Sequence, residues 1–307
     1  MNATRKKIRI VVPPRAGATG VAARGQAVSR IPAGQLATMP PAPKSVKIEL
    51  TAQCDWRCSF CGQPGREKKR GEMSWPLFTR LVGEMADAGV EEVGFFFLGE
   101  SFLCDWLPDA IGHAKARGIP FAFLTTNGTA ATPERVRACM EAGLDSLKFS
   151  VNFAGDEDFA DLALARPSLY HEALENLKSA RRVRDEGGYG CGLYASSLDL
   201  GPGHAQRMEP VLADVLPYVD EHYWQPLHVK GGPIPIPCWS VFTQAHVTFD
   251  GKLSACGFEA DGAAIMADLT RVSFLEGWQC ERFARLRNAH LERDVSCTLC
   301  EECGRVR

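Results

Sequence analysis

Strand-like and helix-like segments alternate between residues 45 and 225, and this alternation constrains the fold more than any other feature of the chain. Each short apolar run is followed by a longer segment with helical periodicity. The expected strands are 46–50, 92–97, 120–124, 146–151, 190–196 and 220–225. The expected helices are 75–88, 105–117, 132–142, 168–186 and 204–216. Six β/α-type repeats predict an α/β fold built on a parallel sheet.

Two of the expected strands show how this sheet is covered. Residues 93–98 and 121–124 are almost continuously apolar, as strands covered on both faces should be. Parallel sheets of this kind place their working residues in the loops that follow the carboxyl ends of the strands. We therefore expect the functional residues at these strand ends.

The pattern changes on both sides of the repeats. Residues 1–43 contain seven basic residues, no acidic ones, and many Pro, Gly and Ala, which predicts a loosely draped arm. A flap over the active site and an anion-binding arm are the alternatives for this segment. After about residue 230 a run of Gly and Pro marks a second boundary. The predicted domains are the arm 1–43, a (β/α)6 core 44–230 and a small domain 231–307.

The small domain has its own local signals. Asp250 and Gly251 lie between two apolar runs, 245–249 and 252–256, and such a dipeptide is the strongest short-range signal of a β-hairpin. A helix is expected over 279–291, just before the last cysteines. The domain is therefore predicted to consist of a cysteine-rich hairpin and a helix.

Composition restricts the cellular setting and the partners. The chain has 307 residues, and its formal net charge of -2 gives no basic footprint for a nucleic-acid partner. It contains no secretory-type leader and no apolar run of membrane-spanning length, so we expect a cytoplasmic protein without a membrane partner. Its 12 cysteines are then expected to bind metal or do redox work rather than form disulfides.

The first cysteine group follows the first expected strand directly. Cys54, Cys58 and Cys61 stand at Cys-x3-Cys-x2-Cys spacing, so three thiolates can converge on one centre. A [4Fe–4S] cluster normally takes four cysteines, and three leave one iron open to a small molecule. A three-cysteine zinc site and chance spacing are the alternatives.

This spacing, with the aromatic Phe60 before the third cysteine, resembles the signature of the radical S-adenosylmethionine superfamily. The resemblance implies a partial TIM-like (β/α)6 barrel and a [4Fe–4S] cluster whose open iron is chelated by S-adenosylmethionine. It also implies that an electron from the reduced cluster cleaves this cofactor to a 5′-deoxyadenosyl radical, which removes a substrate hydrogen. A reductant such as flavodoxin or ferredoxin is an implied partner.

Later strand ends resemble further motifs of the superfamily. Gly99-Glu100 occupies the place of a Gly-Gly-Glu-type turn that meets the amino group of the cofactor, although Leu98 replaces its first Gly. A Thr-Asn-Gly turn and the polar end of the fourth strand follow. The resemblance gives cofactor contacts to Phe60, Gly99, Glu100, Thr126, Asn127, Ser150 and Asn152.

A second cysteine group lies in the small domain, and its spacing resembles the auxiliary-cluster modules called SPASM and Twitch. Its candidate ligands are Cys238, Cys256, Cys297, Cys300 and Cys303. Five cysteines compete for four places, and we favour the first four, with Cys303 as a spare or alternative ligand. One auxiliary cluster, expected to be [4Fe–4S], is implied. A four-cysteine zinc ribbon is the alternative.

Other candidates are assigned less directly. Cys191 and Cys104 lie outside both groups and are candidate hydrogen donors, although buried packing is the default for such cysteines. His204 and Lys230 are candidate bases at late strand ends. Further residues in similar positions are His228, Glu259 and Asp261.

An auxiliary cluster beside a radical-generating cluster favours a two-electron oxidation, in which the second cluster accepts the surplus electron. The leading hypothesis is dehydrogenation of a small natural-product, sugar or aminocyclitol-type intermediate, so a small-molecule substrate is favoured over a peptide. The alternatives are oxidation or crosslinking of a ribosomally made peptide, radical epimerisation with a cysteine hydrogen donor, and a non-enzymatic zinc-binding module.

Overall fold

One nine-stranded sheet forms the centre of the molecule, in the strand order β6-β5-β4-β3-β2-β1-β7-β8-β9. The computed structural model describes residues 20, 23–24, 29–65, 70–227, 236–257, 262–301 and 303. The strands are β1 Ser45–Ile48, β2 Glu92–Gly94, β3 Phe121–Thr126, β4 Ser146–Ser150, β5 Gly192–Asp199, β6 Glu221–Pro226, β7 Gln244–Val247, β8 Lys252–Ser254 and β9 Ile265–Asp268. The strands β1 to β6 pair in parallel, and the predicted α/β fold with a partial barrel is confirmed.

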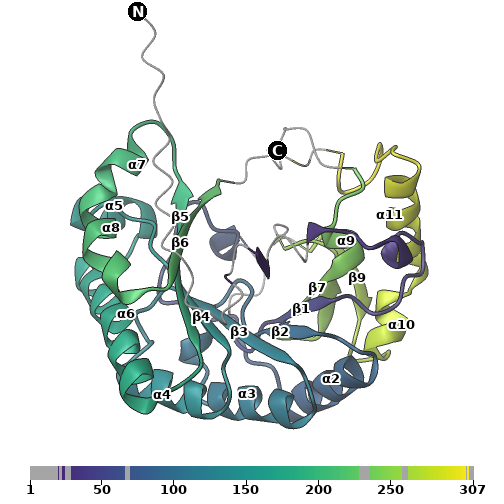
Figure 1. Ribbon diagram of the computed structural model, residues 1–307. Coiled ribbons are helices and arrows are strands. Elements are labelled where there is room, and N and C mark those ends of the chain that lie inside the picture. The colour runs from purple at the N-terminus through teal and green to yellow at the C-terminus, as the bar shows by residue number, and fades with distance from the viewer. Residues whose placement is uncertain are drawn as a thin grey trace, which may run out of the picture.

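Helices cover the convex face of this curved sheet (Figure 1). The α-helices are α2 Trp75–Asp87, α3 Leu107–Ala116, α4 Pro133–Glu141, α5 Asp156–Ala163, α6 Pro167–Gly187, α7 His204–Arg207, α8 Glu209–Val215, α9 Ser240–Thr243, α10 Phe274–Trp278 and α11 Glu281–Leu291. The 3-10 helices are η1 Ala33–Gln35, η2 Gln63–Gly65, η3 Ser101–Leu103 and η4 Leu216–Tyr218. No described helix is both long and apolar enough to cross a lipid bilayer.

The core lies between the sheet and these helices. In α2 the residues Phe78, Leu81, Val82 and Met85 are buried at helical spacing and form one apolar stripe. Along each strand the side chains alternate, so one set enters this core and the other faces the concave side of the sheet. The concave face therefore carries the side chains that surround the interior of the half-barrel.

The C-terminal hairpin forms as predicted, but it also joins the barrel sheet. Strands β7 and β8 are antiparallel, and Gly251 in their turn has a φ of +78°, which favours glycine. Strand β7 pairs in parallel with β1 over four residues, from Ser45 opposite Gln244 onward. One continuous sheet thus crosses the predicted boundary near residue 230, and the domain limits themselves stay a prediction.

Several local expectations differ from the structure. The expected helix 204–216 is divided into α7, α8 and η4, because Pro210 in the first turn of α8 has no N–H to continue a helix from α7. Helix α5, strand β9 and helix α10 were not expected. These are short elements, and α10 begins with a capping box between Ser273 and Glu276.

The end of the N-terminal arm is tied to the C-terminal helices rather than loosely draped. The side chains of Trp278 and Gln279 each donate to a backbone carbonyl, of Pro41 and Pro40 respectively, at 2.8 Å. Arg287, which is fully buried, donates to the carbonyl of Thr38 at 3.2 Å. Buried donors that need acceptors hold this part of the arm in place.

Candidate active site and metal-binding cysteines

The loop with the first three cysteines follows β1, at the carboxyl edge of the parallel sheet. The backbone N–H of Cys61 donates to the carbonyl of Cys58 at 3.0 Å, which turns the loop between these two thiols. Two further backbone hydrogen bonds, from Arg57 to Ala163 and from Ser59 to Leu162, fasten the loop to the end of α5. The loop is thus held by an element that the sequence did not predict.

Trp56, between the first two cysteines, anchors the loop from inside. Its ring packs edge-to-face on Phe153 and Phe159 with centroid distances of 5.6 and 5.0 Å, and its indole N–H donates to Thr129 at 2.9 Å. Trp56 is only 5% exposed. Phe60 also packs on Phe153, 6.0 Å between centroids. An aromatic cluster therefore fixes both ends of the Cys-x3-Cys-x2-Cys segment.

The three thiols have the donor chemistry that an iron–sulfur cluster needs. Burial raises the pKa of Cys58 to about 12, and burial followed by the nearby Glu100 carboxylate raises that of Cys54. Such thiols ionise only when a positive centre compensates the charge, which a metal ion provides. Within the described ranges no three His, Cys, Asp or Glu side chains are gathered at metal-binding distances. Ligation by Cys54, Cys58 and Cys61 is therefore a proposal from spacing and donor chemistry.

The Gly99-Glu100 turn lies directly against the cysteine loop. A Cβ at Gly99 would lie 1.9 Å from the carbonyl oxygen of Thr51, so only glycine fits here. The backbone N–H of Glu100 donates to the carbonyl of Gln53 at 2.7 Å. The carboxylate of Glu49, buried at the end of β1, accepts from the N–H groups of Leu98 and Gly99 at 3.2 and 3.1 Å.

Glu100 joins two successive loops, those after β2 and β3, through its carboxylate. It accepts from the N–H of Phe102 at 3.0 Å, from the hydroxyl of Thr126 at 2.8 Å and from the N–H of Asn127 at 2.7 Å. Burial is the largest cause that raises the pKa of Glu100, to about 7, although these donors act against it. The predicted residues Gly99, Glu100, Thr126 and Asn127 thus form one connected network beside Cys54.

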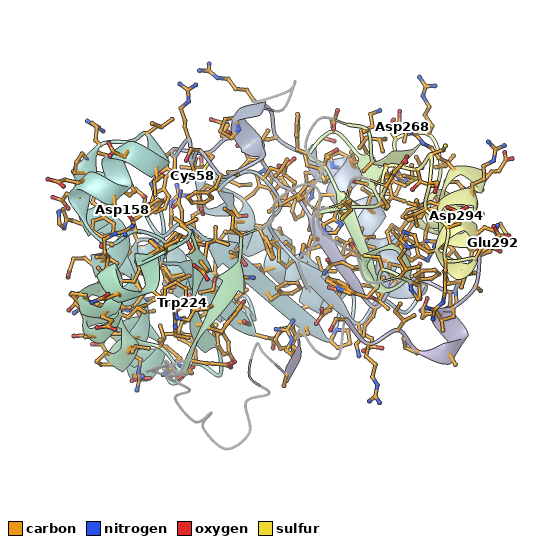
Figure 2. All side chains as sticks on the ribbon, turned by 90° about the horizontal axis from the view of Figure 1, so that it is seen from above. Cys58, Asp158, Trp224, Asp268, Glu292 and Asp294 are labelled. Atoms are coloured by element: carbon orange, nitrogen blue, oxygen red, sulfur yellow. The ribbon has the colours of Figure 1, made fainter. Side chains whose placement is uncertain are left out.

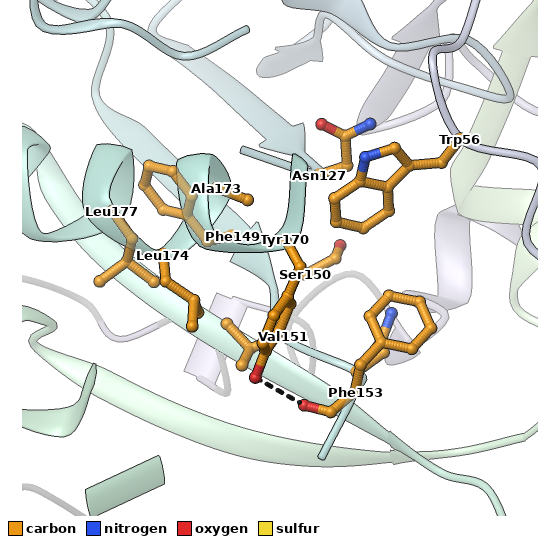
Figure 3. A pocket seen from close by; sticks show the side chains of 11 residues that line it. Trp56, Asn127, Phe149, Ser150, Val151, Phe153, Tyr170, Ala173, Leu174 and Leu177 are labelled. Carbon is orange, nitrogen blue, oxygen red and sulfur yellow. Dashed lines mark hydrogen bonds between the residues drawn. The ribbon is translucent and has the colours of Figure 1, made fainter. Parts of the chain in front are cut away.

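Asn127 also reaches the cysteine loop. Its side-chain amide donates to Asp55 at 2.7 Å and lies 3.9 Å from the Sγ of Cys54. Figure 3 shows Asn127, Trp56 and Ser150 around a small pocket, which has a volume of about 10 Å³, room for a single water molecule. Asn127 and Ser150 border the loop from the β3 and β4 side.

Sequence reasoning missed Glu49, Asp55 and Trp56. Glu49 is 1% exposed. The sequence offered one signal for it, since an acidic residue at the end of an apolar strand is unusual unless it has a partner. Its second oxygen accepts from the N–H of Phe249 at 3.2 Å, a contact that spans 200 positions in the sequence. This carboxylate therefore connects the Gly99 turn with the C-terminal hairpin.

Two predicted residues are occupied by structural contacts. The side-chain oxygen of Asn152 accepts from the N–H of Leu198 at 3.0 Å. His204 is 1% exposed; its Nε2 donates to the carbonyl of Asn152 at 3.0 Å, and its Nδ1 accepts from the N–H of Leu200 at 3.5 Å. The two ring nitrogens thus contact the backbone after β4 and after β5, and the base role of His204 stays a prediction.

The cysteine hydrogen-donor candidates lie in the core. Cys191 immediately precedes β5, at the amino edge of the sheet and so opposite the cysteine loop, and burial raises its pKa. Cys104 is 1% exposed among core residues, and burial raises its pKa to about 12. Both thiols thus lie among core residues, and a hydrogen-donor role for either stays a prediction. Lys230, His228, Glu259 and Asp261 lie outside the described residues.

Two cysteines of the second group, Cys238 and Cys300, contact His290 on α11. Its Nδ1 accepts from the N–H of Cys238 at 3.4 Å, and its Nε2 lies 3.4 Å from the Sγ of Cys300. Two of the predicted ligands are therefore brought together by a histidine that the sequence did not single out. Cys297 is exposed, with a φ of +60°, and its N–H donates to Glu301 at 2.8 Å.

Cys256 and Cys303 are the remaining two predicted ligands, and each is held by a hydrogen bond of its backbone N–H. Cys256 follows β8, and its N–H donates to the hydroxyl of Ser254 at 3.3 Å. The N–H of Cys303 donates to the carbonyl of Cys300 at 3.2 Å. Figure 2 shows Cys58 near Asp158 on one side of the molecule and Asp294, after α11, on the other.

Two family profiles match this chain at the places where these groups lie. Residues 48–193 match the Radical SAM superfamily, and residues 238–304 match SPASM, an iron–sulfur cluster-binding domain. The chain belongs to the radical SAM superfamily. It is therefore an enzyme of this superfamily, whose radical SAM domain implies a [4Fe–4S] cluster with S-adenosylmethionine and whose SPASM domain implies auxiliary iron–sulfur binding.

Individual relatives include radical SAM enzymes with different partners. A PqqA peptide cyclase from Streptomyces rochei is 31% identical over 147 residues, 48% of this chain and 38% of that protein. The chain thus spans less than two fifths of that relative's length. Among solved structures, BtrN in complex with AdoMet and 2-DOIA has a TM-score of 0.57 at 17% identity, covering 82% of this chain and 88% of BtrN.

Another similar structure is SuiB from Streptococcus suis bound to precursor peptide SuiA. Its TM-score is 0.62 at 14% identity, with 87% of this chain and 70% of SuiB covered. At these identities the likeness to BtrN and SuiB shows the fold alone.

Proposed function

We propose that this radical SAM enzyme oxidises its substrate by two electrons, with Cys54, Cys58 and Cys61 holding the cluster that binds S-adenosylmethionine. When bound, this cluster supplies the electron that cleaves the cofactor and so starts hydrogen removal from the substrate. The chain's own part is to position the groups. The Glu100 network joins the loops after β2 and β3 and fixes them against the cysteine loop.

One observation supports the oxidative assignment: Cys256, of the second cysteine group, lies beside a residue of the concave face. A Cβ at Gly257, next to Cys256, would lie 2.6 Å from the Nε2 of His246. His246 alternates along β7 with the core residues Ala245 and Val247, so it belongs to the concave face. Strand β7 pairs with β1, which leads into the first cysteine loop. An electron acceptor held at Cys256 is thus adjacent to the space in which a substrate radical would form.

We propose a small molecule as the substrate, a carbon skeleton oxidised at one C–H bond, as in sugar or aminocyclitol dehydrogenation. The likeness in fold to BtrN, bound to 2-DOIA, covers 82% of this chain and 88% of BtrN and is the comparison behind this choice. Peptide maturation is the second candidate, because the PqqA peptide cyclase is 31% identical to a stretch of this chain. A flavodoxin or ferredoxin is the proposed reductant.

The substrate class is tested with fractions from the organism that carries the gene. The anaerobic holoenzyme is supplied with reductant and S-adenosylmethionine, and 5′-deoxyadenosine is measured with each fraction. We expect a low-mass fraction to stimulate its formation, and protease treatment to leave this stimulation unchanged. Stimulation that protease abolishes would replace the small-molecule proposal with the peptide one.

Oxidation is tested separately with paired replacement of Cys238 and Cys256 by alanine. Loss of the second site should leave cleavage of S-adenosylmethionine detectable and abolish the oxidised product. Full product formation without these two thiols would contradict an electron-accepting role for the second site.

A further inference from the structure

Lys148 stands in the middle of β4 and projects from the concave face of the sheet. Its neighbours Leu147 and Phe149 both enter the core beneath the helices, and alternation turns Lys148 to the opposite side. Its register partners are Thr125 on β3 and Tyr194 on β5. A long cationic side chain is thus directed into the interior of the half-barrel.

The contact of Lys148 with Tyr223 confirms this direction. Its ammonium lies 5.7 Å from the centroid of the Tyr223 ring on β6. Strand β5 separates β4 from β6 in the sheet, so the side chain crosses β5 on the concave face to reach this ring. The ring face offers a weak cation–π contact at this distance and no counter-charge.

Lys148 differs from Arg24, which lies over the Phe121 and Phe123 rings, in having no acidic partner among the described residues. Among the described residues, Arg24 pairs with Glu92 at 2.7 Å, whereas no carboxylate forms a salt bridge with Lys148. Burial is the only cause that changes the pKa of Lys148, which it lowers to about 8. A cation taken from water without a counter-charge is costly, and proteins usually pair it.

The position of Lys148 relative to the cysteine loop indicates that this cation can contact a substrate. Ser150, two residues further along β4, borders the pocket that Asn127 also lines. Two residues of a strand span roughly 7 Å. Lys148 is therefore one layer deeper in the half-barrel than the loops proposed to hold the cofactor, where a substrate on the concave face would reach it.

We propose that Lys148 binds a carboxylate group of the substrate, so that this enzyme acts on an anionic compound. The proposal rests on the proposed function, because it places the substrate on the concave face. The bound carboxylate would supply the counter-charge that the fold omits, and would orient the rest of the substrate toward the loops after β1, β2 and β3. The carboxylate belongs either to a free small acid or to an acidic side chain of a peptide.

The test measures binding, not turnover, of defined probes. Phenylacetate, its neutral isostere phenylacetamide, and an acetylated and amidated Gly-Glu-Gly peptide are titrated into the anaerobic holoenzyme with S-adenosylmethionine present, using calorimetry. The variants are Lys148→Met, which keeps length without charge, and Lys148→Arg, which keeps charge. Lys178→Met is the matched control, because Lys178 on α6 pairs with Glu175 and Asp214 at the surface. Unfolding curves check that each variant is folded.

We expect the wild type to bind phenylacetate at least tenfold more tightly than the amide. This preference should disappear in Lys148→Met and persist in Lys148→Arg and Lys178→Met. Tighter binding of the peptide than of phenylacetate would identify the acidic side chain as the source of the carboxylate. Equal affinity of wild type for acid and amide, no binding of either acid, or an acid preference retained in Lys148→Met would overturn the proposal. Failure of the proposed function would instead appear as missing iron or missing 5′-deoxyadenosine.

Discussion

Removing the ring of Trp56 should release the cysteine loop, and the cost can be worked from its contacts. The side chain is 5% exposed, packs on two rings and donates one hydrogen bond of 2.9 Å. Replacing a buried Trp by Ala costs about 3–5 kcal/mol in other cores. Trp56→Phe keeps most of the packing and loses the hydrogen bond to Thr129, which is worth about 1 kcal/mol.

Urea unfolding of cluster-free protein, followed by circular dichroism, measures both free energies. Trp75→Ala is the control; its ring is 42% exposed, and it should cost markedly less than Trp56→Ala. Because Trp56 lies between Cys54 and Cys58, Trp56→Ala should also lower the iron retained after reconstitution. If the free energy of unfolding of Trp56→Ala lies within about 1 kcal/mol of the wild-type value and the variant retains full iron, the aromatic cluster does not hold the loop.

Three further changes test separate parts of the structure. The hydrogen bond from Lys252 lowers the pKa of Asp268 to about 2, so Asp268 stabilises the pairing of β8 with β9 above about pH 4 and loses this effect as pH falls through 2. Asp268→Asn should therefore cost about 1 kcal/mol at pH 7, after allowance for solvent screening, and almost nothing at pH 2 in urea titrations. Arg287→Met should cost about 3 kcal/mol or more in the same assay, since it leaves three carbonyl acceptors unpaired in the core; an unchanged midpoint would refute this. Cys191→Ala should leave both 5′-deoxyadenosine and product formation per iron unchanged; a variant that still forms 5′-deoxyadenosine but no longer forms product would instead support Cys191 as a hydrogen donor.

The parts of the fold that were predictable depend on local sequence. The apolar strand 121–124 and the stripe at Phe78, Leu81, Val82 and Met85 carry their period within a few residues, so the parallel sheet and its helices followed from the chain. The break at Pro210 in the expected helix 204–216 was also a local signal that was overlooked. Helix α5 was missed because its eight residues are too few for a helical pattern to be separated from that of the longer helix that follows.

The parts of the site that could not be predicted depend on long-range contacts. Spacing brought Cys54, Cys58 and Cys61 together on one loop, and successive strand ends placed Glu100 near Thr126. By contrast, the hydrogen bond from Phe249 to Glu49 joins residues 200 positions apart in the sequence, and the one between Cys238 and His290 joins residues 52 positions apart. No periodicity encodes such pairs: the first arises where β7 adds to the edge of β1, and the second where α11 packs beside α9. The surroundings of concave-face residues such as Lys148 likewise become known only from the assembled sheet.

The central claim is that Cys54, Cys58 and Cys61 hold a cluster that cleaves S-adenosylmethionine. The direct measurement compares wild type with the variant in which all three are alanine, each purified anaerobically, reconstituted, and assayed for iron, sulfide, zinc and 5′-deoxyadenosine. The variant should lose about four irons per chain and form no 5′-deoxyadenosine. A wild type that binds stoichiometric zinc without iron, or a variant that still cleaves the cofactor, would contradict this claim.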